Sequence, residues 1–89
     1  MSPTIKKLYY SISEVSEITK LKAYVLRYWE TEFLQLNPPK NRAGNRTYRQ
    51  KDIDMILKIK ELLYDRKFTI DGARNILKAN ESTIKNQKD

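Results

Sequence analysis

The stretch "SISEVSEITKLKAYVLRYWETEF", residues 11–33, predicts two short helices joined by a tight turn. It opens with Ser11 and then Glu14, a capping-box spacing in which each side chain can bond the backbone N–H of the other residue. The box places the start of a first helix at Ile12, and its apolar spacing predicts an end near Thr19. The predicted inner face of this helix comprises Ile12, Val15 and Ile18, continued by Leu21.

The second predicted helix, residues 22–33, has two faces of different character. Helical spacing places Val25, Leu26, Trp29 and Phe33 on a core face, and Tyr24, Arg27, Tyr28 and Thr31 on the opposite face. Two tyrosines and an arginine are unusual on a helix face that is exposed only to solvent, so this face is a candidate binding surface. Two helices joined by so short a turn form a helix-turn-helix, whose second helix can enter a DNA major groove.

The segment after this helix is strongly basic. Prolines 38 and 39 stop the helix, and residues 38–51 then carry five Lys or Arg and no acid, in a chain whose net charge is +7. Gly44 and Asn45 tolerate positive φ, so a small β-hairpin is predicted, with residues 40–42 leading out and 46–48 returning. A localised basic element favours a polyanionic partner, although a merely solvated basic loop is the alternative.

Two further helices complete the predicted fold. Apolar spacing predicts a third helix from about Gln50 to Arg66 and a fourth after Thr69, which can cap it. The fold class is therefore mainly α: a winged helix-turn-helix of about four helices, with a two-stranded β-hairpin wing between the second and the third. The predicted organisation is a flexible N-terminus at 1–8, the domain at 9–79 and a disordered or frayed tail at 80–89.

Composition excludes several functions. The chain has no cysteine and no histidine, so disulfides, the usual zinc ligand sets and histidine-based acid–base catalysis are excluded. We expect no enzyme activity and no cofactor. The sequence has no apolar run long enough for a signal peptide or a membrane-spanning helix, which predicts a cytoplasmic protein with no membrane partner.

Three segments in this order, "YSISEVSEI", "VLRYWE" and "RAGNRTY", resemble the N-terminal DNA-binding domain of the bacterial MerR family of transcriptional regulators. The resemblance covers about residues 9–77. It implies that Arg27 and Tyr28 lie at the DNA backbone, and that Arg46 and Tyr48 of the wing lie against phosphates. Lys20 and Lys22 stand where the family usually has a turn glycine and a Ser or Thr, and Asn45 replaces an aromatic residue.

The predicted DNA-binding residues lie on the second helix and the wing. They are Lys22, Tyr24, Arg27, Tyr28, Lys40, Arg42, Asn45, Arg46, Tyr48 and Arg49. Lysine and arginine neutralise phosphates, while Lys22 and Tyr24 are nearest to bases because a recognition helix reads with its N-terminal part.

Three of these residues have alternative interpretations. Arg27 could instead form a surface ion pair with Glu30, three residues along the same helix. Tyr28 could be half-buried against the wing. Arg49, with Lys51, opposes the dipole of the third helix, so it either contacts a phosphate or extends into solvent.

The expected partner is double-stranded DNA. The family resemblance further implies a homodimer, formed through a segment absent from this sequence, and RNA polymerase at a promoter on the nucleoid. Two alternatives stay open: an architectural, excisionase-like protein that bends DNA, and a winged helix that binds proteins.

Overall fold

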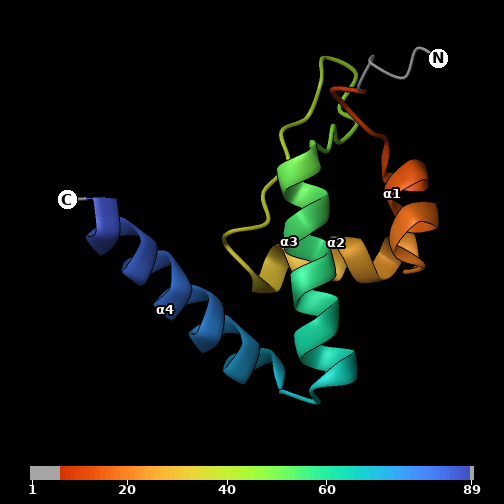
Figure 1. The fold of residues 1–89 in the computed structure, drawn as a ribbon. Coiled ribbons are helices and arrows are strands. Elements are labelled where there is room, and N and C mark those ends of the chain that lie inside the picture. Colours follow the sequence, from red (N-terminus) through yellow and green to blue (C-terminus); the bar gives the residue numbers. More distant parts are fainter. Residues whose placement is uncertain (1–6, 89) are drawn as a thin grey trace, which may run out of the picture. The chain divides into compact units, whose positions relative to one another are not determined.

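A computed structural model of the 89-residue chain describes residues 7–88. The chain divides into two compact units, Met1–Leu57 and Lys58–Asp89. Most of the predicted flexible N-terminus, residues 1–6, lies outside the described residues. The candidate functional residues all belong to the first unit, coloured red to green in Figure 1.

Helix α1, Ile12–Thr19, has the bounds that the capping box and the apolar spacing predict. The Ser11 side chain accepts a hydrogen bond from Glu14 N at 3.2 Å, and Ser11 N donates to Glu14 Oε1 at 2.8 Å. The helix ends at Lys20, whose backbone is left-handed with φ 62°. That conformation turns the chain without the glycine that usually permits it.

One part of the predicted inner face of α1 is wrong. Val15 and Leu21 are buried, but Ile18 is exposed and Thr19 is buried in its place. The Thr19 hydroxyl donates to Val15 O at 2.7 Å, so its polar atom is satisfied inside the unit.

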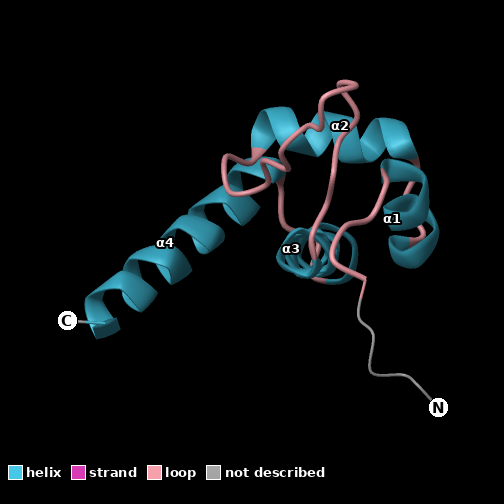
Figure 2. Ribbon diagram, turned by 90° about the horizontal axis from the view of Figure 1, so that it is seen from above, coloured by secondary structure: helices cyan, strands magenta, loops and turns pink. Residues whose placement is uncertain are grey.

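Helix α2, Ala23–Glu32, completes the predicted helix-turn-helix. Lys22 occupies its N-cap and provides no side-chain cap. Leu26, Trp29 and Phe33 are buried as predicted, the last two rings meeting edge to face at 6.4 Å, whereas Val25 is only half-buried. In Figure 1 and Figure 2, α2 runs across the direction of α3, and α1 lies at the N-terminal end of α2.

The predicted β-hairpin wing is not a hairpin. We call residues 39–48 the wing loop; among the described residues it contains no strand, only the isolated bridges Lys40–Arg46 and Tyr10–Tyr48. Two prolines, residues 38 and 39, come directly before Lys40 and have no N–H to donate to a ladder. The returning arm therefore pairs first with Lys40 and then with Tyr10, a residue that precedes α1.

Helix α3, Gln50–Lys60, starts within the first unit. Buried Asp52 accepts a hydrogen bond from Arg49 N at 2.9 Å and thereby satisfies a backbone donor at the helix start. Ile53 and Ile56 are buried, whereas Leu57 is exposed.

The second unit contains the end of α3, the π-helix η1 at Glu61–Asp65 and helix α4 at Ile70–Lys88. The predicted third helix thus continues beyond Lys60 with a wider hydrogen-bond pattern. Thr69 caps α4 as predicted, since its Oγ1 accepts from Gly72 N at 3.0 Å. The α4 backbone stays helical to Lys88, where the sequence predicts a frayed or disordered tail from residue 80; the domain boundaries remain a prediction.

None of the helices described in the chain is both long enough and apolar enough to cross a membrane.

Candidate nucleic-acid interface

The outward face of α2 is exposed, as the sequence predicts. Tyr24 is 67% exposed and Tyr28 is 51% exposed, which agrees with the alternative of a half-buried Tyr28, while its packing against the wing stays a prediction. Arg27 lies between them, exposed, and forms no ion pair with a described residue. The alternative in which Arg27 pairs with Glu30 is therefore wrong, because the Glu30 carboxylate has other partners.

Those partners come from the wing loop. Arg46 Nε lies 2.8 and 2.9 Å from the two oxygens of Glu30, and Tyr48 Oη donates to Glu30 Oε2 at 2.7 Å. Both side chains of the ion pair are largely buried, 24% exposed for Arg46 and 15% for Glu30. One carboxylate on α2 thus holds two residues of the wing loop.

The shared carboxylate also changes the acidity of its partners. Its hydrogen bond raises the pKa of Arg46 above the usual arginine value, so Arg46 stays charged. Burial, followed by the hydrogen bond to Glu30, raises the pKa of Tyr48, so its hydroxyl stays protonated and keeps donating.

A second set of bonds holds the tip of the wing loop. Asn41 Oδ1 accepts from Ala43 N at 2.9 Å and from Asn45 N at 3.0 Å, and Gly44 N donates to Asn41 O at 2.9 Å. Gly44 has φ 86°, a conformation for which its lack of a Cβ is needed. Asn41 was not among the predicted site residues. The sequence pattern that could have identified it is an asparagine at the start of a turn, because its side chain can accept from backbone N–H groups two to four residues later.

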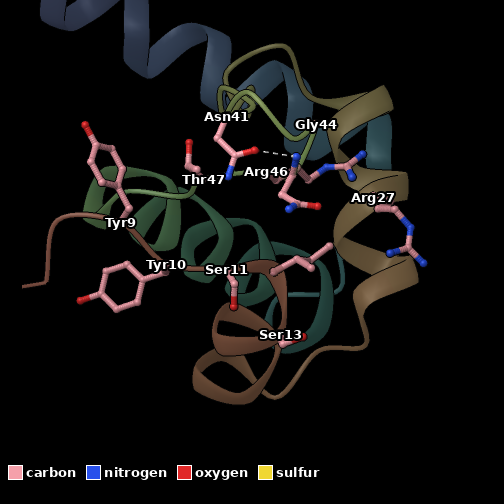
Figure 3. Close-up of a pocket in the computed structure, with 11 residues that line it drawn as sticks. Tyr9, Tyr10, Ser11, Ser13, Arg27, Asn41, Gly44, Arg46 and Thr47 are labelled. Carbon is pink, nitrogen blue, oxygen red and sulfur yellow. Dashed lines mark hydrogen bonds between the residues drawn. The ribbon is translucent and has the colours of Figure 1, made fainter.

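A depression of about 550 Å³ lies between the start of α1, α2 and the wing loop. It is lined by residues 9–13, Arg27, Asn41 and residues 44–47, and we call it the loop groove (Figure 3). Arg27 of α2 and Arg46 of the wing loop both belong to its lining, so basic residues from two different elements border one hollow surface. Because arginine side chains bind phosphate oxygens well, a hollow bordered by the exposed Arg27 and the half-buried Arg46 suits a polyanion.

Four more predicted cations are exposed: Lys22, Lys40, Arg42 and Arg49. None forms an ion pair with any residue in the described part of the chain. Among the cations of the basic segment predicted to bind DNA, Arg46 thus differs from the others in having an acidic partner among the described residues.

The structure brings three of the ten predicted site residues together in the loop groove: Arg27, Asn45 and Arg46. The others lie outside its lining. Tyr48 is a correction: its side chain is 0% exposed and its hydroxyl is bound to Glu30, so it has no surface to offer a phosphate. The sequence could not show this, because the partner of Tyr48 is on another helix.

The described residues contain no group of three or more acidic side chains placed to hold a metal ion. The chemistry present is that of exposed guanidinium, ammonium, phenol and amide groups beside a helix-turn-helix. These groups bind anions and hydrogen-bonding edges.

A helix-turn-helix with such a surface defines a class of regulatory proteins, and comparisons with known proteins place the chain within it. Residues 10–80 match the MerR HTH family regulatory proteins. The chain therefore belongs to the MerR family of helix-turn-helix regulators.

Two relatives illustrate the likeness. The chain is 40% identical over 55 residues to the uncharacterized HTH-type transcriptional regulator YyaN of Bacillus subtilis (strain 168). The alignment covers 62% of this chain and 40% of YyaN, so the chain spans less than half of that relative.

The fold is similar to the crystal structure of HiNmlR, a MerR family regulator lacking the sensor domain, bound to promoter DNA. The TM-score is 0.72 at 20% identity, over 91% of this chain and 68% of the other.

Proposed function

We propose that the chain binds double-stranded DNA as the DNA-binding domain of a transcriptional regulator, with α2 in the major groove and the wing loop on the phosphate backbone. The observation that carries the proposal is the loop groove, where Arg27 of α2 meets Arg46 and Asn45 of the wing loop. The DNA-bound state of HiNmlR, which shares this fold, supports it.

The proposed division of labour follows from the chemistry of each side chain. Arg27, Lys40 and Arg42 neutralise phosphates, which gives affinity without sequence preference. Lys22 and Tyr24 stand at the N-terminal end of α2, where a recognition helix approaches base edges. Arg49 completes the phosphate surface at the start of α3.

A second copy would double these contacts on a two-fold site, because one small domain binds DNA weakly. We propose that the complete protein is a homodimer that meets RNA polymerase at a promoter in the cytoplasm, on the nucleoid. Membership of a family of regulators supports this function over the DNA-bending and protein-binding alternatives.

Salt dependence tests the proposal. The affinity of the chain for random-sequence duplex DNA should fall steeply with potassium chloride, and an Arg27→Ala/Arg42→Ala variant should reduce the log–log slope by about two units. Arg66→Ala/Lys78→Ala removes the same charge from exposed residues of the second unit and should leave the slope near wild type.

Two outcomes would contradict the proposal. Wild-type chain that fails to bind DNA even at low salt would remove it altogether. Equal slopes for the two double variants would mean that affinity follows net charge and not the surface formed by α2 and the wing loop.

A further inference from the structure

We infer that Glu30 is a positioning residue for DNA binding: its carboxylate orients Arg46 as a phosphate-binding fork and holds the wing loop on the recognition helix. This inference rests on the proposed function. Glu30 is an acidic residue on the helix that is proposed to enter the DNA major groove. Its negative charge repels the phosphates, so its role there must be something other than attracting DNA.

The geometry at Arg46 carries the first step. Only Nε of its guanidinium faces Glu30, at 2.8 and 2.9 Å from the two carboxylate oxygens. The N–H groups of its two Nη atoms form no hydrogen bond with a described residue. Arg46 also lines the loop groove beside Arg27. A guanidinium that is fixed through Nε, and whose Nη atoms have no partner among the described residues, can donate to a phosphate without first changing rotamer.

The wing loop carries the second step. Its tip is held internally by Asn41, and its returning arm is paired with Tyr10 through Tyr10 N to Tyr48 O at 2.7 Å and Tyr48 N to Tyr10 O at 2.9 Å. The bonds from Arg46 and Tyr48 to Glu30 join this preformed loop to α2. A fixed distance between loop and helix is what simultaneous contact with a major groove and a neighbouring phosphate requires.

A competing interpretation is that the ion pair neutralises Arg46 and removes it from DNA binding. The two interpretations predict opposite signs for one substitution. Glu30→Gln raises the net charge by one and releases Arg46, so neutralisation predicts tighter binding. Positioning predicts weaker binding, because Arg46 and the wing loop lose their anchor.

The experiment measures the affinity of the 89-residue chain for a fluorescent random-sequence duplex across a potassium chloride series. Glu30→Gln and Arg46→Ala should each weaken binding by roughly tenfold, as expected for loss of a charge-assisted contact, and reduce the salt slope by about one unit. The Glu30→Gln/Arg46→Ala double variant should lose less affinity than the sum of the two single losses, because both changes remove the contact between Arg46 and Glu30.

The matched control is Glu17→Gln, which makes the same charge change at an exposed residue of α1 that has no partner among the described residues. It should bind as tightly as wild type or slightly more so. Glu30→Gln binding as tightly as Glu17→Gln would overturn the inference, as would Arg46→Ala binding like wild type.

Arg46→Lys keeps the charge and tests the inference even if Glu30→Gln fails to fold. An arginine can bind Glu30 through Nε and a phosphate through its Nη atoms, whereas a lysine has one ammonium group, which would pair with Glu30. Arg46→Lys should therefore bind DNA nearly as weakly as Arg46→Ala. Wild-type affinity for Arg46→Lys would overturn the inference. Wild-type chain that does not bind at all would overturn the proposed function and the inference with it, so the two failures are distinguishable.

Discussion

Replacing Lys20 with glycine should stabilise the first unit. Lys20 ends α1 with φ 62° and ψ 32°, a left-handed conformation that costs a residue with a Cβ about 1–2 kcal/mol. Glycine removes that strain but gains about 0.5–1 kcal/mol of conformational freedom in the unfolded chain, which works against folding. Taken at the midpoints of the two ranges, the net gain is about 0.75 kcal/mol in the free energy of unfolding. For a domain of this size, such a gain raises Tm by roughly 2–8 °C.

Thermal unfolding followed by circular dichroism measures the effect. Lys20→Ala is the control, since it removes the same charge and the same side-chain length but keeps the Cβ, and it should unfold near the wild-type temperature. If Lys20→Gly unfolds at or below the temperature of Lys20→Ala, then the left-handed turn is not strained in solution and the reasoning is refuted. Lys67, with φ 59°, offers the same comparison in the second unit.

Three further predictions concern the cap, the shared carboxylate and the loop tip. Hydrogen bonds from the Lys7 side chain and then from Ser11 N lower the pKa of Glu14, so the stability it contributes is present at neutral pH and is lost as the pH falls through that lowered value. The difference in Tm between wild type and Glu14→Gln should therefore shrink from pH 7 towards about pH 3, and a pH-independent difference would count against the cap. Tyr48→Phe removes the hydroxyl that donates to Glu30 and should cost about 1.5 kcal/mol in urea unfolding; an unchanged midpoint would show that water replaces the bond. Gly44→Ala meets no atom within 4 Å, so its cost comes from φ 86° alone and should be about 1 kcal/mol by the same assay, with a much larger loss pointing to a clash that the structure lacks.

Local patterns predicted the helical part of the fold well. The capping box at Ser11 and Glu14 located the start of α1, and Thr69 located the start of α4, because a cap is a relation between residues only three apart. The apolar spacing also identified the buried Leu26 and Trp29. These features need no knowledge of the rest of the chain.

The wing could not be predicted in the same way. The pattern at residues 44–48 favours a hairpin, but the length of a ladder depends on what its partner segment can donate, and prolines 38 and 39 donate nothing. The π-helix at Glu61–Asp65 also has no sequence signature separate from that of an ordinary helix.

The sequence predicted which segments form the candidate site, but it did not predict the hydrogen bonds among their side chains. Charge identified the basic segment, and the family resemblance placed its residues Arg46 and Tyr48 against phosphates. In the structure both are bound to Glu30, sixteen and eighteen residues earlier in the chain. A contact of that separation depends on the fold, so the sequence could suggest Glu30 only as a neighbour of Arg27.

The pairing of Tyr10 with Tyr48 gives the segment before α1 a place inside the domain. Each residue donates to the other, and the bonds close a stretch of chain that contains α1, α2 and the wing loop. A gene trimmed to begin at Ser11 would keep every helix, yet it would leave the buried Tyr48 with an unpaired N–H and an unpaired C=O. The practical boundary for expressing this domain therefore lies upstream of Tyr10, in residues that a list of helices would discard.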